Sequence, residues 1–484
     1  MQTVETLIPF SVWHYFNAIS KIPRPSKHEE QIIKYIVDFA IEKKLEYKKD
    51  AIGNILISKP GSSGKENLAT VVLQSHLDMV CEKNANVMHD FMTDPINIRI
   101  DGEWVKANGT TLGADDGIGI ATMLAILDDN SIEHGPLECL FTVDEETGLT
   151  GAFELSPEFF SGKTLINLDS EDEGELFIGC AGGIDTQATF YYKSEKVKTP
   201  KNAYRINITG LQGGHSGDEI HLGLGNAIKM MTEFLFYISQ SFEYSLNRFD
   251  GGNLKNAIPR ESFAVIVFDT SNETLFLKIV EKYIKSIPGK FIKIEPNWRL
   301  ITEKVDCPDI VLDSVFQSKL LKVLNDCPDG VIAWSSSIPG LVETSTNLAS
   351  IKFENPSEVL IVTSQRSSVE KSKKDIANRI AGIFYEAGGS IKHSAGYPGW
   401  EPNVDSAILK MTRDLYFELF NEKPQVKAIH AGLECGLFLE KYQKLDMISF
   451  GPTIKGAHSP DERLLIVSVQ KFWVLLLEVL KHWV

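Results

Sequence analysis

The sequence predicts an α/β protein in which a second domain of α+β texture is inserted. In the first part of the chain, short apolar runs rich in β-branched residues alternate with stretches of helical periodicity, which is typical of a sheet with a parallel component. Residues 186–395 contain strands in which apolar and polar residues alternate more regularly. After Gly396 the short apolar runs and helical stretches return. We therefore expect one domain built from residues 1–185 and 396–484, interrupted by the inserted domain.

The first segment opens with helical patterns. Ser26 and Glu29 have the spacing of a capping box, and apolar residues recur at helical intervals from Ile32 to Ala40. Further along, short apolar runs predict buried strands over 68–73, 137–143 and 165–168, and a buried helix over 117–127.

The inserted segment contains alternating strands such as AYRINITG and ESFAVIVFDT, with helical stretches such as GNAIKMMTEFLFYI and SVEKSKKDIANRIAGIFYEA between them. Two stretches, GGNLKNAIPRESFAVIVF and ETSTNLASIKFENPSEVLIVTS, each place an Asn-bearing strand before a polar turn and another strand. The similarity of these two stretches indicates either an inserted domain of two similar halves or the ordinary pattern of a β-hairpin. In the last segment, KLDMISF predicts a core strand, and the apolar C-terminal stretch predicts a buried helix.

The composition limits the classes of partner. The 484 residues include 65 acidic and 49 basic residues, for a net charge of −16. Such an acidic chain is a poor match for nucleic acid or an anionic membrane. The longest apolar run near the C-terminus, 472–477, is too short to span a bilayer, and the first residues lack the pattern of a signal peptide. Six scattered cysteines without a CxxC pair favour a reducing, cytoplasmic location.

Four acidic or histidine-bearing clusters follow apolar strands or begin a helix. They contain His76 and Asp78, Asp115 and Asp116, Glu145 and Glu146, and Asp169. Each cluster alone has an ordinary explanation as a surface pair, a helix cap or a solvated loop. Ligands bind beyond the carboxyl ends of strands in open α/β sheets, so this shared position predicts one convergent metal site. Imidazole and carboxylate groups without a thiolate suit zinc, manganese or cobalt.

These motifs resemble a known family. LQSHLDMV, TTLGADDGIGIA, FTVDEETGLTGA, INLDSEDEGE and the late AHSPDE are similar to motifs of the dinuclear-zinc metallopeptidases that include carnosinases, aminoacylases and carboxypeptidases. IPRPSKHEE, GGHSGDEIHLGLGNA, KNAIPRE, SQRSS, HSAGYPGWEPN and IHAGLECGLF extend the resemblance over nearly the whole chain, toward the branch that cleaves aminoacyl-histidine dipeptides. The resemblance implies a three-layer zinc-exopeptidase catalytic domain interrupted by a lid domain.

The resemblance also implies a set of metal ligands. Two divalent ions are expected, zinc with cobalt or manganese as alternatives. Matching positions assign His76, Asp115 and Asp169 to one ion, and Asp115, Glu146 and His458 to the other. Asp78 is expected to orient the His76 ring. Glu145 is expected to take a proton from the attacking water and return one to the leaving amine, as a general base and then acid.

Residues of the lid are expected to bind the substrate. His215 matches the family position that stabilises the oxyanion, and Asn256 matches one that touches substrate. Arg366 is expected to bind the free carboxylate, because the planar guanidinium can bind a carboxylate bidentately. Glu434 is either a reader of the substrate amino end or an ordinary helix-cap carboxylate. Since His215 and Arg366 lie in the inserted domain and the expected metal ligands in the other domain, lid closure would assemble the site.

The sequence therefore predicts a cytoplasmic metallodipeptidase acting on dipeptides with a free carboxylate, with Xaa-His substrates favoured by the resemblance. Two alternatives stay open. One is an amidohydrolase of the same fold that removes an acyl group from an amino acid, and the other is a non-catalytic peptide- or metal-binding protein. The expected partner is a small dipeptide rather than nucleic acid or membrane, and the choice between monomer and homodimer is left open.

Overall fold

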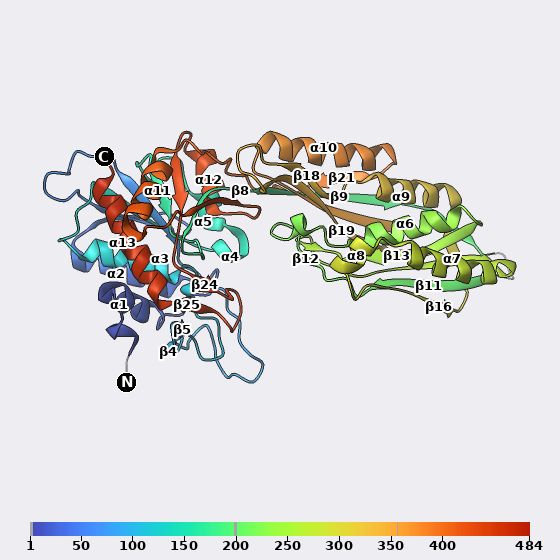
Figure 1. Ribbon diagram of the computed structural model, residues 1–484, viewed down its shortest axis with the longest axis horizontal. Coiled ribbons are helices and arrows are strands. Elements are labelled where there is room, and N and C mark those ends of the chain that lie inside the picture. The colour runs from blue at the N-terminus through green and yellow to red at the C-terminus, as the bar shows by residue number, and fades with distance from the viewer. Residues whose placement is uncertain (1–2, 198–200, 356) are drawn as a thin grey trace. The chain divides into compact units, whose positions relative to one another are not determined.

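The computed structural model describes residues 3–197, 201–355 and 357–484. The chain folds into two compact units, which Figure 1 shows with their elements labelled. The first unit comprises Met1–Gly179, Pro402–Ala428 and Leu433–Val484, and the second comprises Cys180–Glu401 and Ile429–Gly432.

These bounds differ from the predicted division at 185/186 and 395/396. The short segment 429–432, expected in the first domain, belongs to the second unit. Backbone hydrogen bonds explain the difference, because the Ala181 amide donates to the carbonyls of both Ile429 and Ala431 at 3.0 Å. Hydrogen bonding of this kind between distant segments leaves no local pattern in the sequence.

The first unit is built on a mixed eight-stranded sheet. Its strand order is β1 (Glu46–Lys49), β2 (Ile55–Lys59), β6 (Leu137–Thr142), β3 (Val71–His76), β7 (Thr164–Asn167), β23 (Asp446–Ser449), β8 (Glu175–Cys180) and β22 (Gln425–Ile429). The four central strands are all parallel to one another; they are β6, β3, β7 and β23. Every residue of β3 and β7 is buried, so both faces of the sheet are covered, as the continuous apolar runs predicted.

Helices cover this sheet. They are α1 (Phe10–Ile19), α2 (Glu30–Lys43), α3 (Ala114–Asp128), α4 (Glu145–Gly148), α5 (Thr150–Glu154), α11 (Ala407–Phe420), α12 (Glu434–Lys441) and α13 (Ile466–His482). Helix α3 packs against β3 and α1, and α11 packs against β23 and α13. Because all its residues from Ala114 to Leu127 are buried, α3 shows no polar face in the sequence. The predicted α/β class is confirmed.

A small antiparallel sheet completes the first unit. It contains β24 (Ile454–Lys455), β25 (Arg463–Leu465), β5 (Trp104–Lys106) and β4 (Arg99–Asp101). Strands β24 and β25 form a hairpin whose loop, 456–462, carries His458. Among the described residues, none of the helices has the length and apolar character that crossing a bilayer requires.

Two local predictions in the first unit were wrong. Ser26 does not cap α2, because its hydroxyl donates instead to Asp78 Oδ2 at 2.7 Å, and the N-cap residue is Glu29 without a side-chain cap. The strand expected from residue 68 begins at Val71, whose amide donates to the carbonyl of Pro136. In the first case a buried partner distant in sequence displaced a local one.

The second unit has an antiparallel sheet. Its order is β16 (Arg299–Val305), β11 (Lys201–Thr209), β15 (Ser262–Asp269), β13 (Tyr244–Gly251), β19 (Val342–Asn355), β20 (Glu358–Ser367), β9 (Gly182–Tyr191) and β21 (Ser390–His393), with β18 (Gly330–Trp334) also pairing with β19. Two short pairs are β10 (Ser194–Lys196) with β17 (Ile310–Leu312), and β12 (Gly214–His215) with β14 (Ala257–Ile258).

Helices of the second unit pack over one face of its large sheet (Figure 1). They are α6 (Ala227–Ser239), α7 (Glu273–Ser286), α8 (Gly289–Ile294), α9 (Ser314–Asp326) and α10 (Glu370–Glu386). The core between them includes Phe234, Phe268 and Phe384, all fully buried. The helices expected from GNAIKMMTEFLFYI and SVEKSKKDIANRIAGIFYEA correspond to α6 and α10.

Candidate active site

The parallel strands of the first unit deliver side chains to one edge of the sheet. Strand β3 ends at His76, while Glu145 follows β6 and Asp169 follows β7. Because neighbouring parallel strands end on the same side, their carboxyl ends bring these residues together. Asp115 joins them from the start of α3, and His458 from the loop between β24 and β25.

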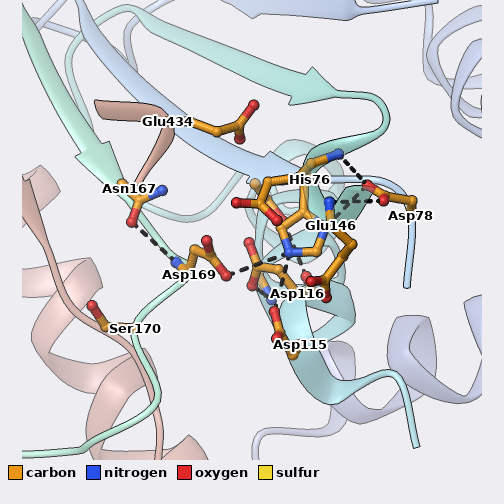
Figure 2. A network of polar contacts seen from close by, with 12 residues as sticks. His76, Asp78, Asp115, Asp116, Glu146, Asn167, Asp169, Ser170 and Glu434 are labelled. Carbon is orange, nitrogen blue, oxygen red and sulfur yellow. Dashed lines mark hydrogen bonds and ion pairs between the residues drawn. The ribbon is translucent and has the colours of Figure 1, made fainter. Parts of the chain in front are cut away.

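Asp115 lies between two imidazole rings. Its Oδ1 is 3.1 Å from His76 Nε2, and its Oδ2 is 3.1 Å from His458 Nε2. His76 Nε2 is also 3.5 Å from Asp169 Oδ1, and His458 Nε2 is 3.1 Å from Glu146 Oε2. Figure 2 shows these carboxylates gathered around His76. The contacts form two sets of ligand atoms that share the Asp115 carboxylate, which is the arrangement a bridging carboxylate requires.

Asp78 connects His76 to the start of α4. Its Oδ1 is 3.3 Å from His76 Nδ1, and its two oxygens accept hydrogen bonds from the amides of Glu145 and Glu146 at 3.0 and 3.2 Å. Burial alone would raise the pKa of Asp78, but hydrogen bonds from His76, Ser26 and the Glu145 amide lower it to about 2. This carboxylate is therefore ionised and fixes both the His76 ring and the following acidic pair.

The cluster has an excess of negative charge. Burial is the main reason that the pKa of Asp169 lies well above its ordinary value and that of Asp116 rises to about 7. Burial lowers the pKa of His76, but Asp169 and Asp115 raise it by more than burial lowers it, so the pKa lies well above its ordinary value. Hydrogen bonds to Asp115 and Glu146 raise the pKa of His458 to about 11. Carboxylates and histidines gathered in this way suit a bound cation.

Glu145 lies beside both ligand sets without belonging to them. Its carboxylate forms a group with His76 and Glu146 in which the nearest ligand atoms all lie within 4.8 Å of one another. Burial raises the pKa of Glu145 well above its ordinary value, and repulsion from Glu434 and Glu146 adds to the shift, while His76 opposes it. A carboxylate with a raised proton affinity next to a cation site is suited to accept a proton from water.

A buried hydrogen-bond network lies under the cluster. Glu434 Oε2 accepts hydrogen bonds from Gln74 Nε2 at 2.6 Å and from Thr142 Oγ1 at 2.8 Å. Gln74 in turn accepts a hydrogen bond from Asn167 Nδ2 at 2.6 Å. Asn167 precedes Asp169 by two residues, and Figure 2 shows the two side by side. Glu434 is 1% exposed, burial raises its pKa to about 7, and its Oε1 has no hydrogen-bond partner among the described residues. One oxygen thus anchors Glu434, and the other can accept a further donor.

His215 and Asn256 lie on adjacent segments of the second unit. His215 in β12 pairs with Ala257 in β14, and the carbonyl of Asn256 accepts the Ser216 amide at 2.8 Å. The Nδ1 atom of His215 is 2.9 Å from Asp218 Oδ2, while the side chain of Asn256 is exposed. The ring of His215 is therefore oriented by Asp218, which leaves its Nε2 atom for another contact.

Arg366 is held within the sheet of the second unit. It lies on β20, paired with Ser345 on one side and Gly183 on the other, and is 7% exposed. Its Nη1 donates to the Tyr397 hydroxyl at 2.9 Å, and its Nε has no hydrogen-bond partner among the described residues. The Tyr397 ring fits between two glycines, because a Cβ at Gly183 or Gly432 would come within 2.8 Å of it. The guanidinium is thus fixed while retaining an unused donor.

His430 is a further buried group beside Arg366 and His215. Its Nε2 is 2.7 Å from Ser345 Oγ, and burial, with a smaller contribution from Arg366, lowers its pKa to about 4. A Cβ at Gly217 would lie 2.5 Å from the His430 carbonyl, so the 215–218 turn packs directly against this residue. His430 and Tyr397 were not identified individually from the sequence, although both lie in motifs that carry the resemblance.

The structure thus divides the expected site residues into two groups. In the first unit it brings together His76, Asp78, Asp115, Glu145, Glu146, Asp169 and His458, with Glu434 in the adjoining network. In the second unit, His215 and Arg366 both lie near Asp218, whose pKa they lower, and Asn256 adjoins the His215 turn.

Comparisons with known proteins agree with this architecture. The profile of peptidase family M20/M25/M40 matches residues 72–482. The cytosol non-specific dipeptidase of Escherichia coli K12 is 43% identical over 482 residues, covering 100% of this chain and 99% of that protein.

Solved structures are similar as well. The crystal structure of aminoacylhistidine dipeptidase from Vibrio alginolyticus matches with a TM-score of 0.94 and 42% identity, covering 99% of this chain and 98% of that one. Aminopeptidase PepT from Bacillus cereus matches with a TM-score of 0.57 and 15% identity over 98% of both chains, and this likeness concerns the fold alone.

Proposed function

Because the chain belongs to peptidase family M20/M25/M40, we propose that it is a metal-dependent dipeptidase. Its substrates are dipeptides with a free C-terminal carboxylate, Xaa-His dipeptides among them. Two relatives that are more than 40% identical over nearly the full length support this proposal, one named a non-specific dipeptidase and the other an aminoacylhistidine dipeptidase. The name of the Escherichia coli relative also supports a cytosolic location.

The observation that carries the proposal is the position of Asp115 between two histidines. Each of its oxygens faces one ring, and each ring faces a further carboxylate. Glu146 Oε1 is buried without a hydrogen-bond partner among the described residues, which is consistent with a group reserved for a metal. His76, Asp115 and Asp169 would hold one divalent cation, and Asp115, Glu146 and His458 a second. The donor set suits zinc, with cobalt or manganese as alternatives.

Two divalent cations bound there would polarise the scissile carbonyl and lower the pKa of an attacking water. Glu145 would accept the proton of that water and donate a proton to the leaving amine. Asp78 supports both metal binding and proton transfer, because it orients the His76 ring and accepts a hydrogen bond from the amide of Glu145. The raised proton affinity of Glu145 suits a group that must take and then return a proton.

Substrate recognition is assigned to four polar side chains. Arg366 would bind the free carboxylate, since Tyr397 fixes its guanidinium and its Nε remains unused. His215, oriented by Asp218, would donate to the oxyanion, and Asn256 would contact the substrate backbone. Glu434 Oε1 would accept a hydrogen bond from the substrate amino group, a role that its lack of a partner supports.

A substrate panel tests this function. Metal-stripped protein is reconstituted with Zn²⁺, Co²⁺ or Mn²⁺ and assayed with Gly-His, β-Ala-His, Ala-Leu and N-acetyl-histidine. We expect the reconstituted protein to release free histidine from Gly-His and β-Ala-His and leucine from Ala-Leu, with negligible hydrolysis before reconstitution. Faster hydrolysis of N-acetyl-histidine than of any dipeptide would instead identify an acyl-amino-acid amidohydrolase.

A further inference from the structure

Glu462 lies in the same hairpin loop as His458, and its carboxylate is bound to the loop that carries Asp115. Its Oε2 accepts hydrogen bonds from the amides of Leu112 and Gly113 at 2.7 and 3.0 Å. Its Oε1 accepts from the amides of Ala114 and Asp115 at 2.7 and 3.3 Å. Glu462 is 2% exposed, so water does not compete for these bonds. One side chain thus satisfies four consecutive amides at the start of α3.

The geometry of this turn explains why a carboxylate is needed. Gly113 has φ 68° and ψ 34°, a left-handed conformation that turns successive amides toward one point. The four amide dipoles converge on one place, where a carboxylate can accept all of them. A neutral side chain offers fewer acceptor sites and would leave part of this buried ring of amides unsatisfied.

Arg24 binds the opposite side of the same turn. Its Nη2 donates to the Gly113 carbonyl at 2.5 Å, and its Nη1 donates to the carbonyls of Leu77 and Asp78 at 3.0 and 2.6 Å. Arg24 is 3% exposed, and a Cβ at Gly113 or Gly117 would come within 2.7 Å of its Nη2. The two glycines therefore leave room for this guanidinium.

Three metal-site loops are thereby connected through two buried charges. Arg24 joins the loop after His76 to the Asp115 turn, and Glu462 joins the Asp115 turn to the His458 loop. We propose that Glu462, with Arg24 opposite it, is a positioning residue that fixes the Asp115 carboxylate between His76 and His458 before metal binds. The inference rests on the proposed metal site. Partners that orient metal ligands commonly change metal affinity 10–100-fold when they are removed.

The test uses Co²⁺, whose visible absorption reports its coordination. Metal-free wild-type, Glu462→Gln and Asp461→Asn proteins are titrated with Co²⁺ in the presence of a competing chelator. Asp461→Asn is the matched control, because Asp461 is exposed and lies next to Glu462. The substitution removes the same charge and leaves the hydrogen bonds to the amides of the turn in place. We expect Glu462→Gln to weaken Co²⁺ binding about 10–100-fold and to alter the absorption spectrum, whereas Asp461→Asn binds like wild type.

Two further variants separate the possible failures. If His76→Ala binds Co²⁺ like wild type, the metal site itself is wrong. If His76→Ala loses Co²⁺ while Glu462→Gln keeps the wild-type affinity and spectrum, the site stands and the positioning role is overturned. Should circular dichroism show that Glu462→Gln does not fold, Glu462→Asp, which keeps the charge on a shorter arm, decides. Weakened Co²⁺ binding by Glu462→Asp supports the proposal, and unchanged binding overturns it.

Discussion

The polar clusters of the two units have opposite electrostatic character. In the first unit, buried carboxylates surround His76 and raise its pKa well above the ordinary value. In the second, burial and the charge of Arg366 lower the pKa of His430 to about 4. The carboxylates of the first cluster suit a cation, whereas the buried guanidinium of Arg366 in the second suits an anion. A metal-assisted attack on a substrate with a free carboxylate requires one of each, so the comparison supports a division of labour between chemistry and recognition.

The two clusters also differ in how the backbone presents them. Asp169 and Glu145 follow parallel strands, at the edge where such sheets collect ligands. Arg366 instead lies within β20, paired with a strand on each side. A side chain on a doubly paired strand has little backbone freedom, whereas the loops of the first unit depend on buried contacts, such as those of Arg24 and Glu462, to hold their side chains. The two clusters are therefore held in place by different means.

The largest effect is expected from Asp115→Asn. An amide offers one carboxyl-type oxygen instead of two, so the variant should lose at least one metal ion per chain and on the order of 10³-fold or more in dipeptide hydrolysis. Metal analysis after dialysis and a Gly-His assay measure both. Asp116→Asn is the matched control, because Asp116 belongs to neither ligand set. Metal loss in the control rather than in Asp115→Asn would contradict the bridging role.

Glu145→Gln should separate chemistry from metal binding. The amide cannot take a proton from water, so kcat should fall about 10²–10⁴-fold while metal content and dipeptide affinity stay near wild type. Stopped assays at saturating Gly-His and calorimetric binding of the same dipeptide provide the readouts. Hydrolysis at the wild-type rate by a metal-loaded Glu145→Gln would remove Glu145 from the mechanism.

Tyr397→Phe tests the recognition side with a smaller change. Removing the hydroxyl leaves the Arg366 guanidinium without its 2.9 Å partner, which should raise KM for dipeptides about 3–10-fold, or roughly 1 kcal/mol, with kcat nearly unchanged. Tyr385→Phe, at a residue that is 73% exposed in the same unit, is the control. An effect on kcat rather than KM would place Tyr397 in the chemical step and blur the division between the units.

The last prediction concerns the dependence of stability on pH rather than activity. Because the pKa of His430 is lowered to about 4 from an ordinary 6.5, the unfolded chain takes up this proton first as the pH falls. The neutral histidine therefore contributes stability that is present above pH 6.5 and is lost between about 6.5 and 4, by up to roughly 3 kcal/mol. The free energy of unfolding of the metal-free protein, measured with denaturant at several pH values, should therefore fall with decreasing pH. In His430→Gln this dependence on pH should be weaker. In contrast, His221→Gln, at an exposed histidine of the same unit, should behave like wild type.

Part of this account could be predicted from the sequence. Continuous apolar runs indicated the buried strands of the first unit, and the acidic clusters that follow them indicated a rim of ligands. The roles of His458 and Arg366 depended on resemblance, because a lone histidine in a loop and an arginine in a strand have no distinctive spacing. Their assignments stay predictions until the variants are measured.

Other features depend on contacts across long stretches of chain. Glu462 accepts hydrogen bonds from amides 347–350 residues earlier in the sequence. Ser26 donates to Asp78 rather than capping the helix that follows it. Likewise, Tyr397 reaches Arg366 through a space that Gly183 and Gly432 leave open. Local propensity does not contain such information, because each interaction exists only once the sheets have formed.

The division of labour is tested most directly by how the protein discriminates Gly-His from glycyl-histidinamide. The measurement is the ratio of kcat/KM for the two substrates in wild type and in Arg366→Met, with metal content checked in each. We predict that wild type strongly prefers the free carboxylate and that Arg366→Met, with its metals retained, loses most of this preference. A preference that survives unchanged in Arg366→Met would contradict the assignment of carboxylate recognition to the second unit.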